Sequence, residues 1–344
     1  MSAVAGVLAQ GVDLGRYNSF GFAARAENFV RVESQAQLRE AVALARANGW
    51  PVLVLGGGSN LVLREQIPGL VIQMAIGGRG AEPVGNDEVR VTLGAGEVWH
   101  QSLEWMLEQG YYGLENLALI PGTVGAAPMQ NIGAYGVELE QAFESLQALD
   151  TETGEVCGFD REACRFGYRD SYFKSGAPGR YIILEVCLRL SQRPRPVLRY
   201  QALVDELQVR GLDNPQPVDV FDVVCAIRRS KLPDPAEVGN AGSFFKNPLV
   251  SQAHYQQLLQ RYPALVAFPA GEGCKLAAGW LIDQCGFKGE TRGAVGVYKR
   301  QALVLVNLGD GTAAELMCLA QEIVVSVEAR FGVTLEMEPR LYPA

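Results

Sequence analysis

The chain has 344 residues, of which 48% are apolar and 20% charged, and its formal net charge is −8. This length allows two or three domains with separate cores, and the composition is that of an ordinary globular protein. The acidic balance argues against nucleic acid or an anionic membrane as a partner, but it does not exclude an anionic small molecule, because local basic groups decide that.

The first third of the chain predicts a small α/β unit. Ser34 and Gln37 have the spacing of a helix start, and Leu38, Val42 and Ala45 follow at helical spacing. Short apolar runs that predict strands then occupy residues 52–55, 61–63 and 69–74, with a glycine stretch between the first two.

The middle of the chain predicts more strand than helix. A strand over 89–93 precedes a helix over 98–109, whose apolar residues share one face and which stops at Gly110. Residues 119–136 are too rich in glycine and proline for one regular element. Strands are expected again at 145–149 and 181–190.

Several prolines between 194 and 217 mark a boundary before the last third. Helices are expected over 218–232, 251–260 and 275–285, followed by a strand over 302–307. A second helix start at Thr312 and Glu315 opens a helix that Gly332 closes, and residues 333–338 are expected to form a final strand that joins either of the first two sheets.

No window approaches the roughly eighteen uninterrupted apolar residues of a membrane span, and the N-terminus lacks the basic region of a signal peptide. The seven cysteines contain no Cys-x-x-Cys pair, which suits reduced thiols in a cytoplasmic protein. With only His100 and His254, we expect no metal site and no histidine-based triad. The chemistry must depend on other side chains or on a cofactor.

The stretch from Leu55 to Asn60 reads Leu-Gly-Gly-Gly-Ser-Asn and follows a buried strand. Consecutive glycines expose backbone N–H groups that can bind a phosphate or pyrophosphate, and Ser59 and Asn60 add side-chain donors. The alternative is a tight turn between strands. The third glycine of a dinucleotide fingerprint and the lysine of a P-loop are both missing.

Two further loops could contact a ligand. The glycine turns between Pro121 and Gly136 would let a flat ligand lie against backbone, although a purely structural loop is the alternative. Arg169 lies in an aromatic segment, where it either pairs with Asp170 or holds a carboxylate in a bidentate manner.

Ser243 follows a glycine in an irregular segment with no histidine nearby, which argues against a hydrolase. A serine hydroxyl that protonates a carbanion is chemically easier, and Lys231 or Lys246 could polarise it. Near the C-terminus, Glu336 and Glu338 alternate on one face of the expected strand, and Glu338 with Arg340 could face a site.

These segments, in this order, resemble the UDP-N-acetylenolpyruvoylglucosamine reductase family. The resemblance rests on residues 56–60, 120–136, 168–171, 231–235 and 242–248 and on the terminal Glu338-x-Arg340. It spans nearly the whole chain, and residues 196–200 resemble the tyrosine-bearing loop of the longer form of this family.

The resemblance implies an α+β flavoenzyme fold of the vanillyl-alcohol-oxidase (PCMH) type. Two FAD-binding subdomains would occupy residues 1–78, with 327–344 returning to the first, and residues 79–215. A C-terminal substrate-binding domain would occupy residues 216–326.

The resemblance also implies non-covalent FAD, NADPH as hydride donor and reduction of UDP-N-acetylglucosamine enolpyruvate to UDP-N-acetylmuramate during peptidoglycan precursor synthesis. The enzyme would be a cytoplasmic monomer. The implied FAD-binding residues are Leu55, Gly56, Gly57, Gly58, Ser59, Asn60, Pro121, Gly122, Thr123, Gly125, Ala126, Gln130, Asn131, Gly133 and Ala134.

Three residues would carry the reaction. Arg169 and Glu338 would stabilise negative charge on the enolpyruvyl group, Glu338 either protonated or acting through Arg340, and Ser243 would protonate the α-carbon. The implied substrate-binding residues are Tyr135, Tyr168, Tyr200, Lys231, Asn247 and Gln301.

Two other functions remain open at this point. One is an FAD-linked oxidase of hydroxy acids or sugars on the same scaffold. The other is a nucleotide-sugar-binding protein without turnover, which a bound yellow cofactor would argue against.

Overall fold

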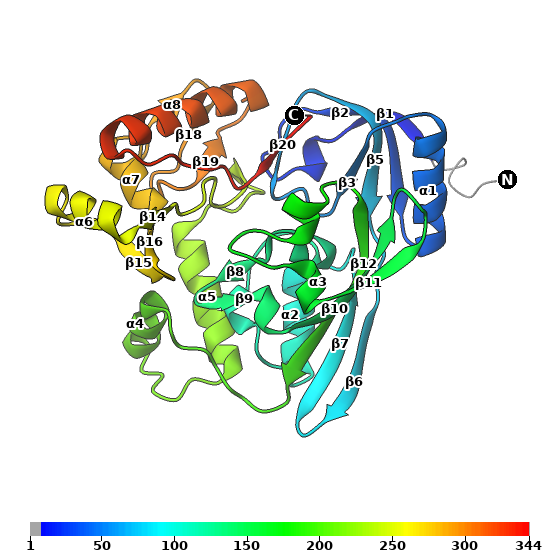
Figure 1. The fold of residues 1–344 in the computed structure, drawn as a ribbon, viewed down its shortest axis with the longest axis horizontal. Helices are drawn as coiled ribbons and strands as arrows, with labels where there is room; N and C mark the ends of the chain where they lie inside the picture. Colours follow the sequence, from blue (N-terminus) through cyan, green and yellow to red (C-terminus); the bar gives the residue numbers. More distant parts are fainter. Residues whose placement is uncertain (1–7, 344) are drawn as a thin grey trace. The chain divides into compact units, whose positions relative to one another are not determined.

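The computed structural model describes residues 8–343, which divide into two compact units. The first unit contains residues 8–12, 26–57 and 68–230, and the second contains 13–25, 58–67 and 231–343. Figure 1 labels most of their helices and strands.

In the described part of the chain, the first unit contains a four-stranded sheet with the order β1-β2-β5-β3. The strands are β1 (Ala9–Asp13), β2 (Arg25–Val32), β3 (Val52–Leu55) and β5 (Gln66–Met74). Helix α1 (Gln35–Ala47) buries Leu38 and Val42 in the core of this unit. It begins where the sequence predicts, because the Ser34 hydroxyl accepts a hydrogen bond from the N–H of Gln37.

A five-stranded antiparallel sheet with the order β11-β10-β12-β7-β6 forms the larger part of this unit among the described residues. Its strands are β6 (Arg79–Gly85), β7 (Glu88–Gly94), β10 (Phe143–Asp150), β11 (Val156–Asp160) and β12 (Tyr181–Ser191). The helices of this region are α2 (Trp99–Glu108), α3 (Arg161–Cys164), α4 (Gln201–Val209) and α5 (Pro217–Lys231).

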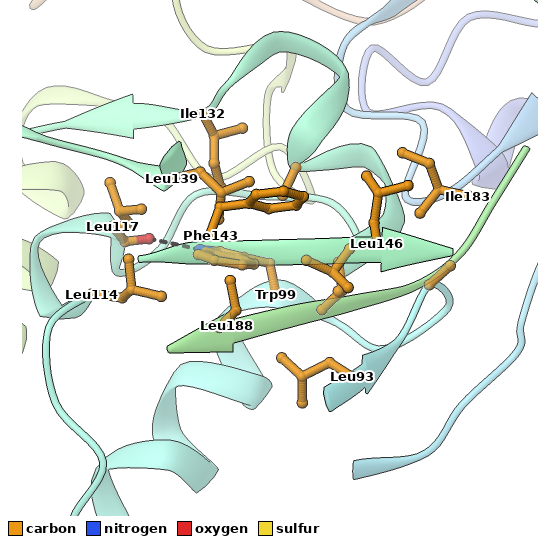
Figure 2. Packing of buried hydrophobic residues seen from close by; sticks show 14 of the residues in the cluster. Leu93, Trp99, Leu114, Leu117, Ile132, Leu139, Phe143, Leu146, Ile183 and Leu188 are labelled. Carbon is orange, nitrogen blue, oxygen red and sulfur yellow. Dashed lines mark hydrogen bonds between the residues drawn. The ribbon is translucent and has the colours of Figure 1, made fainter. Parts of the chain in front are cut away.

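Trp99, at the start of α2, is buried in the hydrophobic core of this unit. Figure 2 shows its ring among leucines and Phe143, with its indole N–H directed at the carbonyl of Leu117. That hydrogen bond measures 3.0 Å, and Trp99 is only 1% exposed. The indole therefore fills the core and also satisfies a buried carbonyl.

Short elements connect the strands of the first unit. The 3₁₀ turns η2 (Glu115–Leu117), η3 (Val124–Ala126), η4 (Pro128–Gln130) and η5 (Leu139–Gln141) and the hairpin strands β8 (Gly133–Ala134) and β9 (Val137–Glu138) follow α2, and the π-helical turn η6 (Tyr172–Gly176) precedes β12. The loop expected over 119–136 is thus built of turns, as its glycines and prolines indicate.

The second unit has its own hydrophobic core, which includes Phe20, Phe244 and Phe245. Its elements are η1 (Gly15–Tyr17), β4 (Leu61–Leu63), β13 (Gly239–Asn240), β14 (Leu249–Ser251), α6 (Gln252–Arg261), β15 (Ala267–Ala270), β16 (Gly273–Leu276), α7 (Ala278–Gln284), β17 (Thr291–Arg292), β18 (Val295–Val297), β19 (Leu305–Asn307), α8 (Ala313–Phe331) and β20 (Arg340–Tyr342). Helix α8 begins with the predicted capping box of Thr312 and Glu315 and ends at Gly332, whose φ is +64°.

The final strand predicted over 333–338 is wrong. Residues 333–338 form one β-bridge, between Met337 and Phe245, and the last strand is β20, which pairs in parallel with β4. Pro339 explains the shift, since it has no N–H to donate and interrupts the ladder. Strand β20 therefore joins neither of the two large sheets.

Two other boundaries differ from the predictions. The helix expected over 275–285 begins only at Ala278, because Gly273–Leu276 pairs with β14 and β15 as strand β16. The strand expected over 302–307 is shortened to β19. The elements that were not predicted include strands β1, β2, β6 and β11, helices α3 and α4, and strands β13 to β18.

Among residues 8–343, no helix has the length and apolar character needed to cross a membrane. The same residues contain no group of three or more histidine, cysteine or acidic side chains that could hold a metal ion. The expected division at residues 78, 215 and 326 stays a prediction.

Candidate active site

The glycine stretch begins where β3 ends, directly after the buried Leu55. In the first unit, Gly57 lies against the backbone of Gly122, and a Cβ atom at Gly57 would lie 2.8 Å from the Gly122 Cα. A Cβ at Gly56 would collide with the Thr123 hydroxyl. Two glycine turns far apart in sequence thus approach each other more closely than side chains would allow.

Backbone donors accompany these turns. The N–H groups of Gly57, Gly58 and Ser59 donate no hydrogen bond to any residue between 8 and 343. The φ of Gly58 is +61°, in the left-handed region. Successive N–H groups in such a turn can receive phosphate oxygens, as the sequence predicts.

The loop from Gly122 to Gly125 is fixed by pairing with the start of α2. The N–H of Trp99 donates to the Gly122 carbonyl at 3.1 Å, and the N–H of Gly125 donates to Ala95 at 2.9 Å. A Cβ at Gly125 would lie 2.6 Å from the Cβ of Ala95. Gly125 is therefore needed for packing, while Pro121 and Ala126 are exposed at the surface of the same loop.

Asn131 connects this loop to the segment that carries Arg169. Its side chain is fully buried, donates to the carbonyl of Gly167 at 3.2 Å and accepts from the N–H of Glu140 at 3.0 Å. The hydroxyl of Ser171 adds a bond to the Met129 carbonyl at 2.7 Å. Asn131 therefore supports the loop from inside the protein, while Gln130 is half-buried in η4.

Arg169 lies in a turn with a φ of +55°, a backbone conformation that non-glycine residues seldom adopt. Its guanidinium donates to the carbonyl of Gly133 at 2.6 Å and lies 5.3 Å from the centre of the Tyr168 ring. Asp170 instead accepts a hydrogen bond from Ser175. The arginine is thus held beside β8 and next to Ala134.

Tyr135 lies at the end of β8, and its ring meets that of Tyr200 edge to face, with centroids 5.2 Å apart. The guanidinium of Arg228 lies beside the Tyr135 phenol. Burial raises the pKa of Tyr135, and the positive charge of Arg228 opposes that change. Burial also lowers the pKa of Arg228, and the nearby Arg169 acts in the same direction.

Arg228 is the site residue that sequence reasoning missed. Its Nε atom is buried and has no hydrogen-bond partner among the described residues. The signal was available, because Arg228 follows the buried Val224 by four residues and so lies on the apolar face of α5. A cation on an apolar face indicates either a buried partner or an anionic ligand.

In the second unit, Ser243 follows Gly242, whose φ is +68° and whose N–H donates to the Asn240 side chain at 2.9 Å. The next residue, Phe244, accepts a hydrogen bond from the N–H of Glu338 at 2.9 Å. The backbones carrying Ser243 and Glu338 are therefore adjacent. Both side chains are half-buried.

Asn60 adds a contact to the same segment, since its carbonyl accepts from the N–H of Arg340 at 3.1 Å and its amide donates to the Glu338 carbonyl at 3.4 Å. The two candidate lysines differ in their surroundings. Lys246 forms an ion pair with Glu336, while the Lys231 side chain is exposed. Which lysine polarises Ser243 stays a prediction.

Two predicted substrate residues of the second unit support the backbone around Ser243. The Asn247 side chain accepts from the N–H of Ala278, at the start of α7, at 2.9 Å. The Gln301 side chain accepts from the N–H of Leu303, whose carbonyl receives the N–H of Phe244 at 2.8 Å. The second unit thus brings Ser243, Glu338, Asn247 and Gln301 together, and the first unit brings together Arg169, Tyr135 and Tyr200.

The family model of an FAD-binding domain matches residues 26–159, and that of the UDP-N-acetylenolpyruvoylglucosamine reductase C-terminal domain matches residues 234–342. The predicted order of an FAD-binding part followed by a C-terminal domain, and with it the α+β flavoenzyme fold class, is confirmed. The closely spaced turns at Gly57 and Gly122, together with the N–H groups of residues 57–59, fit the diphosphate group of FAD.

Curated relatives match along nearly the whole chain. The UDP-N-acetylenolpyruvoylglucosamine reductase of Pseudomonas aeruginosa is 54% identical over 95% of this chain and 96% of its own length. The reductase of the same name from Ralstonia nicotianae is 53% identical over 95% of this chain and 96% of its own length.

Solved structures agree with this assignment. The UDP-N-acetylenolpyruvylglucosamine reductase of Thermus caldophilus has a TM-score of 0.66 and 26% identity, over 96% of this chain and 98% of its own. The 6-hydroxy-D-nicotine oxidase of Arthrobacter nicotinovorans has a TM-score of 0.54 at 13% identity, covering 97% and 88%, which shows a shared fold alone. The chain belongs to the UDP-N-acetylenolpyruvoylglucosamine reductase family.

Proposed function

We propose that this protein is the flavin-dependent oxidoreductase that reduces UDP-N-acetylglucosamine enolpyruvate to UDP-N-acetylmuramate, a step of peptidoglycan precursor synthesis. The observation that carries the proposal is the 54% identity to a reductase of that name along 95% of the chain. FAD is the cofactor and NADPH the reductant. Bound FAD would accept a hydride from NADPH and pass it to the substrate, which no side chain of the polypeptide can do.

The residues of the chain would supply binding, electrostatics and a proton. Adding a hydride to the β-carbon of the enolpyruvyl group places negative charge on the α-carbon and its carboxylate. Arg169 is fixed by the Gly133 carbonyl and carries a permanent positive charge suited to that carboxylate. Glu338, if protonated, would donate a hydrogen bond to the same group.

Ser243 would complete the reaction by giving its hydroxyl proton to the α-carbon. The left-handed turn at Gly242 and the pairing of Phe244 with Glu338 support this role, because together they hold Ser243 on a fixed backbone. Lys231 or Lys246 would favour the resulting alkoxide until water restores the proton.

The substrate's diphosphate would bind to Tyr200 and Lys231, with Tyr135, Tyr168, Asn247 and Gln301 contacting other parts of the molecule. FAD would lie along residues 55–60 and 121–134. We further propose a cytoplasmic location, which the free state of all seven cysteines favours. The expectation of a monomer stays a prediction.

An anaerobic titration tests the function. NADPH should bleach the flavin band at about 450 nm, and UDP-N-acetylglucosamine enolpyruvate should then restore it. Recovery with oxygen but not with the enolpyruvyl sugar would indicate an oxidase, and a colourless protein would indicate a binding module.

A pair of serine variants tests the proton donor. Ser243→Ala should keep the bleaching by NADPH but slow the recovery about 100-fold or more, because the proton donor is missing. Ser251→Ala is the matched control in the same unit; it removes the cap of α6 and should lower stability without slowing recovery. Equal effects in both variants would exclude the proposed role of Ser243.

A further inference from the structure

Asn116 is a fully buried polar residue that the proposed reaction does not use. It lies in η2 of the first unit, and its exposed fraction is 0%. Its amide group donates to the carbonyl of Tyr135 at 2.9 Å and to the carbonyl of Val197 at 3.0 Å. These carbonyls lie 19 and 81 residues away in sequence, so one side chain joins two distant segments.

The first of these segments is a strained turn. Tyr135 and Gly136 form the two-residue loop between β8 and β9, and their φ angles are +48° and +84°. Such a turn favours asparagine or aspartate followed by glycine, and a tyrosine in its first position is unfavourable. The bond from Asn116 to the Tyr135 carbonyl is one of the contacts that stabilise this conformation.

The second segment has little backbone support of its own. Residues 194–200 have no regular secondary structure, and Pro194 and Pro196 have no N–H to donate. Between residues 194 and 199, the carbonyl of Val197 is the only backbone group that hydrogen-bonds to another described residue, and it does so with Asn116. Tyr200 follows three residues later and directly precedes α4.

The two segments also touch each other directly. The rings of Tyr135 and Tyr200 pack edge to face, and a Cβ atom at Gly136 would lie 3.6 Å from the Cβ of Arg199. The Oδ1 atom of Asn116 is buried without a partner among the described residues. An apolar residue at this position would avoid the free-energy cost of that unsatisfied oxygen. The benefit of an asparagine here must therefore come from the two hydrogen bonds that its amide group donates.

We propose that Asn116 is a positioning residue that holds Tyr135 and the 197–200 segment together, so that Tyr135 and Tyr200 present one surface to the UDP-sugar. The mutual position of the two tyrosines follows from the structure. That this surface receives the UDP-sugar rests on the proposed function.

Limited trypsin digestion tests the positioning role without any substrate. Trypsin does not cut before proline, so Arg199–Tyr200 is the bond in residues 192–200 that it can cleave, and Arg199 is exposed. In Asn116→Ala the fraction cut after Arg199, followed by mass spectrometry, should rise about tenfold, as expected when two hydrogen bonds are lost. An unchanged cleavage rate would overturn the proposal.

Asn28→Ala is the matched control for this digestion. Asn28 is a buried asparagine of the same unit, 2% exposed, that donates to the Gly69 carbonyl at 3.0 Å. It should lose stability without faster cleavage after Arg199. If Asn116→Ala does not fold, Asn116→Leu keeps the side-chain volume and should show the same increase. If cleavage after Arg199 rises as much in Asn28→Ala as in Asn116→Ala, Asn116 only stabilises the unit in general and the positioning role is wrong.

Binding of UDP-N-acetylglucosamine enolpyruvate tests the second half of the proposal. The dissociation constant should rise about tenfold in Asn116→Ala, while the rate of flavin bleaching by NADPH stays near that of the wild type. In a Tyr200→Ala background, Asn116→Ala should add less than about a twofold change, because it acts through that tyrosine. Fully additive effects would overturn the link to binding.

The two experiments separate this proposal from the proposed function. If the wild type fails to bind the enolpyruvyl sugar, the proposed function is wrong. The digestion result still decides whether Asn116 holds the two segments together.

Discussion

The contact between Gly57 and Gly122 gives a direct test of the cofactor site. Alanine at position 57 would place its Cβ 2.8 Å from the Gly122 Cα, whereas ordinary contact begins at 3.4 Å. The two backbones would have to separate by about 0.6 Å, and such overpacking costs roughly 1–3 kcal/mol. The φ of Gly57 is not in the left-handed region, so the close approach is the reason for the effect, not strain at residue 57 itself.

If the turns hold FAD only at this separation, the same free energy is lost from binding. Because each 1.4 kcal/mol is tenfold, FAD affinity in Gly57→Ala should fall about 5- to 150-fold. The assay is the ratio of flavin to protein after desalting, followed by titration of the apoprotein with FAD. Gly80→Ala is the control, because a Cβ atom added at Gly80 in β6 would meet nothing within 4 Å. Wild-type FAD affinity in Gly57→Ala would refute this reasoning.

Two further predictions concern stability. Arg180 donates a hydrogen bond to the buried Asp150 at 2.8 Å and holds the pKa of that carboxyl below its usual value. The ion pair therefore stabilises the fold above about pH 4, and this stabilisation is lost as the pH falls through the folded-state pKa of Asp150. The melting temperature of Asp150→Asn should therefore be lower than wild type at pH 7 and should fall less steeply between about pH 5 and 3; parallel curves would contradict this. Trp99→Phe removes the hydrogen bond to the Leu117 carbonyl and leaves a cavity, so it should lower the melting temperature by about 5 °C or more. Trp50→Phe, at a half-buried position, is the control and should change the melting temperature by less than about 2 °C. Similar shifts in the two variants would show that the buried hydrogen bond contributes little.

The sequence predicted the elements whose signals are local. Helix α1 and helix α8 begin at side-chain caps that the spacing of Ser34 and Thr312 already indicates. Strand β3 and the turns after it follow from an apolar run that ends in glycines. In these places, local preference and the final fold agree.

The errors occurred where distant pairing decides the outcome. Residues 273–276 are compatible with a helix, but their pairing with β14 and β15 makes them a strand. Residues 333–338 alternate like a strand, yet the segment makes one bridge, and the ladder forms only after Pro339. The strand with which each of these segments pairs cannot be recognised from the sequence of the segment alone.

The candidate site shows the same division. Arg169, Ser243 and Glu338 were predicted by resemblance, and their roles stay proposals. Arg228 and Asn116 were missed because each matters through what the fold places beside it, the Tyr135 phenol in one case and two distant carbonyls in the other. Only the apolar spacing on α5 could have indicated Arg228.

The parallel pairing of β20 with β4 has a consequence for how the protein is made. The partners Leu61 and Arg340 are separated by most of the chain, so β4 leaves the ribosome long before the strand that completes it. Residues 68–230 of the first unit can pack during synthesis, whereas β4 keeps an unpaired edge until β20 has been synthesised. The nascent second unit is thus the part of the polypeptide that chaperones would have to protect.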